Sequence, residues 1–488
     1  MLPLSKYDLL TGLRCHKALW WTTHEPGAPE LKPTEVLKDL FDQGRQVGDL
    51  ARKYVPGGQL VGQQFISLDE RIANTREAIA GNGSTFYEAA FAAAGAYVQV
   101  DVLERLSVGW RIVEVKSSTG VASKHITDVA VQCYIAQQAG LDVREVQIMH
   151  LNKTCFYPRL DSLFVRSDVT ADVTALLNIL PTPIKKAMDA DKGELPDVPI
   201  GDYCWKPQPC PFTPRCHPAA APDDVDVLYR LSPKKRAALS EQAIKRIPDI
   251  PDDFSLSDIQ ERQRKSITRN TLIVGDRLST LLSHFRAPLA FLDFETITRA
   301  IPVWDKCAPW QQVPAQFSCH VQAIDGTVTH HEWLAERPTD PRRPLAEALV
   351  NACSGSTVVF AYYMQFEKAR IEELGQLFPD LKDQLYGIAD KLVDLLPIVR
   401  ENVYHPSFGG GFSLKVVAPA LVSMDYEDLE IKSGGKATLE LGRLLLTTNV
   451  LTAEQRKTIR ANLLTYCKQD TLCLVKLLAK LQALEATS

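Results

Sequence analysis

The stretch that decides the fold of the N-terminal half is YVQVDVL (residues 97–103), followed after a short turn by WRIVEVK (residues 110–116). Apolar and polar residues alternate in both segments, which is typical of β-strands with one buried face. Downstream, residues 125–139 have the spacing of a helix that ends at a glycine, and residues 143–151 again favour a strand. The sequence therefore predicts a βββαβ-like order around this stretch.

The same stretch carries acidic residues and a lysine at spacings that suit metal-assisted hydrolysis. Glu114 and Lys116 are two apart on one strand, so both point to the face where Asp101 of the neighbouring strand can meet them. Gln132 lies one turn after Asp128 on the following helix, so both can face this site. Hydrolysis of a phosphodiester needs carboxylates around a divalent ion and a cation near the water or phosphate. The simpler alternative is a set of ordinary charges on an edge strand.

Four cysteines bracket this stretch, with Cys15 upstream and Cys204, Cys210 and Cys216 downstream. Four thiolates hold either Zn²⁺ or a [4Fe-4S] cluster. Five residues separate each downstream cysteine from the next, which suits tight zinc knuckles poorly, although His217 offers the zinc alternative a further ligand. Buried free thiols are the third alternative.

Residues 1–220 resemble the RecB-type branch of the PD-(D/E)XK nucleases, which includes CRISPR-associated exonucleases with iron–sulfur clusters. The resemblance rests on Asp101, on the E-x-K motif of Glu114 and Lys116, on Gln132 in the following helix and on the four cysteines that flank this region. It implies that Asp101 and Glu114 bind metal and that Lys116 positions water or phosphate. It also implies a place for Gln132 in the helical motif and a structural [4Fe-4S] cluster on the four cysteines. The family usually has tyrosine four residues after that glutamine, where this chain has alanine.

Further along the chain, a second apolar strand ends in acidic residues, in the segment APLAFLDFET (residues 287–296). Strand alternation puts Asp293 and Glu295 on one face, where they can share metal ions. In the expected C-terminal helix, Tyr466 and Asp470 lie one helical turn apart. The sequence therefore predicts a second carboxylate site.

The strand D-x-E with a helical Y-x-x-x-D resembles the DEDDy exonucleases, a DnaQ-type group with an RNase H-like fold. The resemblance implies that both acids of the strand and Asp470 bind metal ions and that Tyr466 orients the attacking water. Glu367 stands where that family commonly has aspartate, so it is the candidate fourth acid. Asp394 is its rival, at a position that is usually structural.

The run GGGFSLK (residues 409–415) lies between these motifs. Its backbone N–H groups can cradle a phosphate, with Lys415 nearby. The alternative is a surface loop without a ligand.

At 488 residues the chain is too long for one ordinary core. We expect an α/β protein of three parts. These are a PD-(D/E)XK restriction-endonuclease-like domain with its cysteine clasp over residues 1–224, a helical connector over 225–284 and an RNase H-like domain over 285–488. The whole chain is similar to a bacterial family that fuses a RecB-like, iron–sulfur-type nuclease domain to a DnaQ-like exonuclease domain.

The expected function is that of a nuclease that uses Mg²⁺ or Mn²⁺ at two centres and acts on DNA, at single-stranded ends, in genome defence or DNA repair. One alternative keeps a single catalytic centre and uses the other domain to bind nucleic acid. Another is a non-catalytic adaptor in a defence or repair complex. RNA is the alternative substrate.

Composition limits the class of partner. The formal net charge of -4 argues against a chain that is basic throughout, although it allows a local basic groove. No apolar run reaches the length that spans a bilayer, and residues 1–6 lack a secretory pattern. We therefore expect a cytoplasmic protein with no membrane partner.

Overall fold

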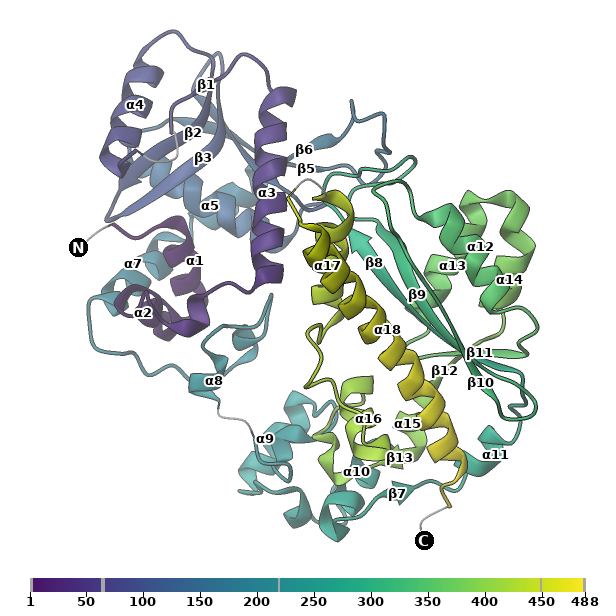
Figure 1. Cartoon of the computed structure of the whole chain (residues 1–488). Helices are drawn as coiled ribbons and strands as arrows, with labels where there is room; N and C mark the ends of the chain where they lie inside the picture. The colour runs from purple at the N-terminus through teal and green to yellow at the C-terminus, as the bar shows by residue number, and fades with distance from the viewer. Residues whose placement is uncertain (1–2, 63–65, 218–219, 448–449, 486–488) are drawn as a thin grey trace. The chain divides into compact units, whose positions relative to one another are not determined.

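The computed structural model describes residues 3–62, 66–217, 220–447 and 450–485. Its helices and strands give a mixed α/β protein (Figure 1). The first two residues of the stretch considered for a secretory pattern lie outside the described residues. Among the described helices, none has both the length and the apolar content to cross a bilayer.

The chain divides into two compact units. Unit 1 comprises Met1–Pro218 and Arg299–Gln311, and unit 2 comprises Ala219–Thr298 and Gln312–Ser488. The expected connector, residues 225–284, falls within unit 2.

Unit 1 is built on a six-stranded sheet in the order β1-β2-β3-β4-β5-β6. Its strands are β1 (Gln59–Leu60), β2 (Thr85–Ala93), β3 (Ala96–Arg105), β4 (Trp110–Lys116), β5 (Val143–Leu151) and β6 (Phe164–Asp168). β2, β3 and β4 are antiparallel neighbours, whereas β4 and β5 run parallel because helix α5 (Ser123–Gln138) returns the chain between them. The strands and helix predicted from residue 97 to residue 151 are confirmed.

Helices pack against this sheet and bury its apolar side chains. Val129 of α5 belongs to one core cluster with Val100 and Ile112 of the strands. Ala51 of α3 packs in another cluster with Val113. The helices of unit 1 are α1 (Lys6–Arg14), α2 (His16–His24), α3 (Glu35–Tyr54), α4 (Leu68–Ala80), α5, α6 (Thr170–Leu177), α7 (Pro181–Asp191) and α8 (Thr213–Cys216).

Helix α1 begins at a reciprocal cap. Ser5 Oγ accepts a hydrogen bond from the Asp8 N–H at 3.2 Å, and the Asp8 carboxylate accepts one from the Ser5 N–H at 2.9 Å. This arrangement satisfies two backbone donors that the first turn would otherwise leave unpaired. It fixes the start of α1 and places Lys6 in the first turn.

Unit 2 contains a five-stranded sheet in the order β10-β9-β8-β11-β12. Its strands are β8 (Leu289–Thr298), β9 (Gln312–Gln322), β10 (Val328–Leu334), β11 (Val358–Ala361) and β12 (Leu392–Asp394). β8, β9 and β10 are antiparallel, whereas β11 runs parallel to both β8 and β12. β8 is therefore the central strand.

Both faces of β8 are buried. Leu289 and Phe291 pack in a cluster with Leu474 of α18, whereas Ala290 and Leu292 pack in the cluster of α12, α13 and α14. The large helices of unit 2 are α12 (Arg342–Ala352), α13 (Gln365–Leu377), α14 (Lys382–Ala389), α15 (Leu395–Asn402), α16 (Leu414–Val422), α17 (Gly434–Leu446) and α18 (Ala453–Gln482). The predicted C-terminal helix is thus confirmed.

The expected connector forms a small helical part with its own apolar cluster, which includes Leu239 and Ile247. Its elements are α9 (Pro233–Glu241), α10 (Asp258–Arg269), β7 (Ile273–Val274) and α11 (Leu278–Leu282). β7 pairs with β13 (Val403–Tyr404), which follows α15. The pairing ties this part to the rest of unit 2.

The glycine run after β13 has a packing role. Gly410 has a φ of +78°, its N–H donates to Tyr404 Oη at 2.9 Å, and a Cβ there would collide with the Val227 carbonyl oxygen. Gly409 has a φ of +53° but has nothing within 4 Å of an added Cβ. Close packing therefore requires glycine at position 410 in particular.

We predict that Gly410→Ala lowers the free energy of unfolding more than Gly409→Ala does. Both substitutions place a side chain at positive φ, which costs about 1–2 kcal/mol. Only the first also drives a Cβ into a backbone carbonyl. Urea unfolding of the two variants measures the difference, and equal losses would contradict the packing role.

Candidate functional site

The acids of unit 2 meet because of the alternation along β8. Leu289 and Phe291 face α18, so Asp293 and Glu295 lie on the same side two and four residues further on. Asp470 of α18 meets them there. One ligand oxygen from each of the three acids lies within 4.8 Å of the others. The structure thus brings together three of the predicted site residues.

These carboxylates repel one another. Burial raises the pKa of Asp293 and of Glu295 well above the ordinary value, and the Asp470 charge adds to both shifts. Burial likewise raises the pKa of Asp470 to about 6. Lys415 opposes the shifts at Glu295 and Asp470 without cancelling them. Carboxylate oxygens at this spacing can hold a divalent cation, which would relieve the repulsion.

Glu367, the candidate fourth acid, stands beside the three-acid group. It lies on α13 with only 3% of its surface exposed, and its Oε2 has no partner among the described residues. Burial raises its pKa to about 8, and its charge acts on Asp293 and Glu295. Its rival Asp394 caps α15 instead, accepting from the N–H groups of Leu396 and Tyr363.

Tyr466 is joined at the site by two residues that the sequence did not single out as catalytic. Lys415 Nζ donates to Tyr466 Oη at 3.1 Å and lies 4.9 Å from the ring centroid of Tyr426. Tyr426 Oη donates to Asp470 Oδ1 at 2.5 Å. Burial and the nearby carboxylates raise the pKa of Tyr466, so its phenol stays protonated. Neither Lys415 nor Tyr426 belongs to a spaced motif with the acids.

In unit 1 three carboxylates form a row across β2, β3 and β4. Tyr87 and Ala89, on either side of Glu88, pair with Val102 and Val100, on either side of Asp101. The β3–β4 pairing includes Val102 and Val113, the neighbours of Asp101 and Glu114. Asp101 Oδ2 accepts from the Val115 N–H at 2.7 Å. Glu88 has a φ of +59° and is held by Arg52 at 2.8 Å. The row unites the predicted Asp101 and Glu114 with a third acid.

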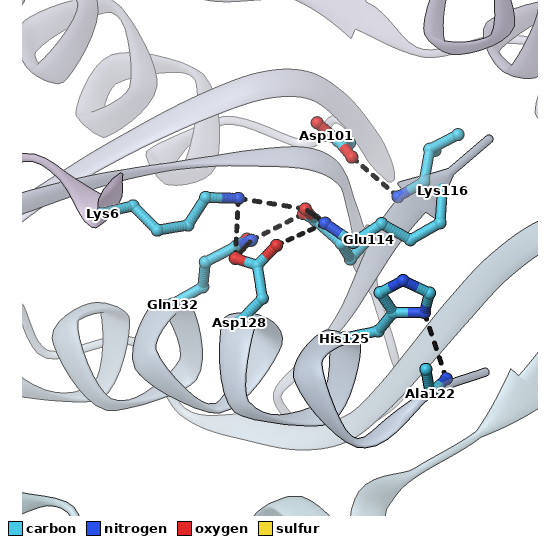
Figure 2. Close-up of polar contacts among 9 residues, drawn as sticks. Lys6, Asp101, Glu114, Lys116, Ala122, His125, Asp128 and Gln132 are labelled. Carbon is cyan, nitrogen blue, oxygen red and sulfur yellow. Dashed lines mark hydrogen bonds and ion pairs between the residues drawn. The ribbon is translucent and has the colours of Figure 1, made fainter. Parts of the chain in front are cut away.

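Internal cations already surround Glu114 (Figure 2). Lys116 donates to Glu114 Oε1 at 2.7 Å and also bonds Asp128. Lys6 lies 3.0 Å from Glu114 Oε1 and 3.0 Å from Asp128 Oδ1. Gln132 Nε2 donates to Glu114 Oε2 at 2.6 Å. Burial alone would raise the pKa of Glu114, but Lys116 and Lys6 outweigh it, so the pKa falls.

The two sites therefore differ in charge balance. In unit 2, mutual repulsion and burial raise the pKa values of Asp293 and Glu295. In unit 1, two lysines stabilise the charge of Glu114. Lys6 was not predicted, because its contact with Glu114 joins positions 108 residues apart with no motif between them.

The four bracketing cysteines converge within unit 1. Cys15, Cys204, Cys210 and Cys216 all line one small cavity. Arg14 fixes the cysteine loop to the end of α1, since it donates to the carbonyl oxygens of Tyr203 and Gln208 at 2.5 Å each.

The spacing of these thiols bears on what they can hold. Among the described residues, the acids of unit 2 form the one group of three ligand atoms within 4.8 Å, so no three cysteine sulfurs are that close. Two sulfurs on one tetrahedral zinc lie about 3.8 Å apart, given Zn–S bonds of about 2.3 Å. The seven remaining cysteines are buried, as expected of small apolar side chains: Cys133, Cys155, Cys307, Cys319, Cys353, Cys467 and Cys473.

Comparison with known proteins gives relatives without a described activity. Residues 290–413 match a family described as "Domain of unknown function (DUF2779)". The chain is 24% identical over 233 residues to the "Uncharacterized protein MG366" of Mycoplasma genitalium, covering 43% of this chain and 34% of that protein. It is 24% identical over 227 residues to the "Uncharacterized protein MG366 homolog" of Mycoplasma pneumoniae, covering 42% and 33%. The chain thus spans about a third of the length of these curated relatives.

We predict that Mg²⁺ stabilises unit 2 and does so more at pH 8 than at pH 5.5. The acids have raised folded-state pKa values. The metal-free protein therefore loses stability as pH rises from about 4, the unfolded value, through about 6 for Asp470 and through the raised pKa values of Asp293 and Glu295. A ligand at 100 times its Kd then restores about 2.7 kcal/mol. Thermal unfolding with and without Mg²⁺ at both pH values measures this.

A substitution separates this site from general ion effects. Glu295→Gln should raise the Tm of the metal-free protein at pH 8 and remove most of the Mg²⁺ response. Glu454→Gln, at an exposed acid near the start of α18, should change neither. A Mg²⁺ response that survives Glu295→Gln would place the ion elsewhere.

Proposed function

We propose that the chain is a divalent-metal-dependent nuclease that hydrolyses DNA phosphodiesters at single-stranded ends, with its principal centre in unit 2. The observation that carries the proposal is the group of Asp293, Glu295 and Asp470, in which Glu295 and Asp470 are buried and Lys415 offsets the repulsion only in part. Converging carboxylates of this kind are what metal-assisted phosphodiester hydrolysis requires.

The strand order of unit 2 supports an RNase H-like domain of the DEDDy type. Its central strand carries D-x-E, two antiparallel strands lie on one side and two parallel strands on the other. Tyr466 and Asp470 follow on α18 with the spacing of that group. The βββαβ order of β2 to β5 likewise supports a PD-(D/E)XK-like fold for unit 1.

At the unit 2 centre, Asp293, Glu295 and Asp470 would hold Mg²⁺ or Mn²⁺. Glu367 lies outside this group of three, and its Oε2 has no partner among the described residues. The bound ion supplies Lewis acidity and makes water a better nucleophile at neutral pH. Tyr466 stays protonated, so its hydroxyl orients the attacking water rather than removing its proton. Lys415 holds the phenol oxygen and offers a cation for a phosphate oxygen.

Unit 1 holds the second proposed centre, on Asp101, Glu114, Lys116 and Gln132. Gln132 is fully buried, and its Oε1 has no partner in the described part of the chain. A buried acceptor without a donor is costly, so this atom favours a ligand at the site. Genome defence or DNA repair is the setting that we propose for both centres.

The four cysteines fit a structural [4Fe-4S] cluster, which would tie α1 to the loop that carries the three downstream thiols. A cubane cluster binds each thiolate at a separate iron, so it accepts more widely spaced sulfurs than one zinc ion does. Burial raises the pKa of Cys210 and of Cys216, and Arg14 and Lys17 respectively oppose these shifts without cancelling them. The spacing of the sulfurs supports the cluster over zinc.

We predict that Asp293→Asn lowers the rate of hydrolysis of a labelled DNA single strand by more than about 100-fold, since it removes a metal ligand. Glu114→Gln should lower a second, separable activity, and the double variant should be inactive. Rates with Mg²⁺ or Mn²⁺ on single strands, duplexes and RNA define the substrate. A double variant as fast as the parent would refute the nuclease assignment, whereas a silent Glu114→Gln would leave unit 1 as a binding platform.

We also predict that protein purified without oxygen is brown, with a broad visible band and about four irons per chain. Cys204→Ser should lose the band and the iron. Cys133→Ala, at a buried thiol of α5 outside the cysteine cavity, should keep both. A colourless protein that contains zinc would rule out the cluster.

A further inference from the structure

Lys6 brings an ammonium group from α1 into the carboxylate row of unit 1. Its Nζ lies 3.0 Å from Glu114 Oε1 and 3.0 Å from Asp128 Oδ1 (Figure 2). Lys116 donates to the same Glu114 oxygen at 2.7 Å. One carboxylate oxygen therefore serves two ammonium groups, while the other accepts from Gln132.

A divalent cation on Glu114 is incompatible with both lysines in these positions. Like charges a few ångströms apart repel strongly in a buried site. Lys116 is on the same strand as Glu114, two residues away. Lys6 reaches in from a different element on a flexible four-carbon stem, and 27% of its side chain is exposed. Lys6 is therefore the residue whose ammonium group can leave the site when a metal ion binds.

Two further observations indicate that the row is built for a ligand. Gln132 is fully buried, yet its Oε1 has no partner among the described residues. Asp101 accepts a backbone N–H but has no cation in direct contact among the described residues, and burial and the Glu114 charge raise its pKa. Around Glu114 there are thus an acceptor without a donor among the described residues and a carboxylate whose charge Lys6 only partly offsets.

The charge count suggests where the displaced ammonium goes. When every group is ionised, as in the metal-bound site, Asp101, Glu114 and Asp128 against Lys6 and Lys116 leave one net negative charge, with Glu88 paired to Arg52. A divalent ion together with one phosphodiester anion adds one positive charge. The complete assembly is then neutral, with an ammonium free to pair with the phosphate.

We propose that Lys6 is a movable phosphate-binding residue of unit 1. Without metal its ammonium occupies the cation position at Glu114, and binding of a divalent ion transfers it to a backbone phosphate of the nucleic acid while Asp128 retains it nearby. The identity of that ligand rests on the proposed function, whereas the exchange of ammonium for metal does not.

The test uses the full chain with Asp293→Asn and Glu295→Gln, so that metal binding in unit 2 is suppressed. Free Mn²⁺ measured by electron paramagnetic resonance then reports binding in unit 1. Lys6→Met should tighten Mn²⁺ binding about tenfold, because the competing cation is gone. Lys6→Arg should stay near the parent. Lys124→Met, at an exposed lysine of α5, is the matched control and should not change the affinity.

A second measurement follows the phosphate contact. Binding of a labelled DNA single strand is titrated against salt with saturating Ca²⁺ in the same background. Lys6→Met should weaken binding and reduce the slope of log affinity against log salt by about 0.7, the share of one phosphate contact on a single strand. Lys6→Arg should keep the parent slope.

The outcomes are separable. Unchanged, weaker or absent Mn²⁺ binding in folded Lys6→Met overturns the exchange, and Lys6→Gln repeats the titration if the methionine variant unfolds. Tighter Mn²⁺ binding with an unchanged salt slope overturns the phosphate contact. Neither measurement requires turnover, so a nuclease assay that fails in the parent protein refutes the proposed function without deciding the metal exchange.

Discussion

The packing of α18 against the central strand β8 is the constraint on which unit 2 depends. Because β8 is buried on both faces, its alternation must match two different helical layers at once. A shift of one residue would move Phe291 away from α18 and carry Asp293 and Glu295 into the opposite core. The apolar packing that stabilises the sheet therefore also selects the face on which the acids meet Asp470.

The two carboxylate sites show two ways of keeping acids in a protein interior. Unit 1 pairs Glu114 with Lys6 and Lys116, which keeps the carboxylate charged. In unit 2 the acids repel one another, and a buried oxygen of Glu367 has no partner in the part of the chain that the structure describes. Burial without pairing costs stability. The first arrangement offsets the charge of Glu114 with its own lysines, whereas the second leaves a repulsion that a bound divalent cation would relieve.

Local spacing accounts for what the sequence predicted, and contacts between distant elements account for what it missed. Asp293 and Glu295 follow from a period of two, and Asp470 follows from its helical spacing to Tyr466. Lys6 and Tyr426 reach the sites only through tertiary packing, across 108 and 44 residues. Gln132 was predicted to face the site, but its unpaired oxygen depends on the packing around it and was not predictable.

Helix α1 physically connects the two sites of unit 1. Lys6 is the first residue of this helix, and Arg14 is the last. Arg14 donates hydrogen bonds to the loop that carries the three downstream cysteines. Nine residues of helix form a rod about 14 Å long, anchored at its start by the Ser5 cap. One short helix therefore connects the thiol cavity to the carboxylate row, and the length of α1 sets the distance between the cysteine loop and the backbone of Lys6.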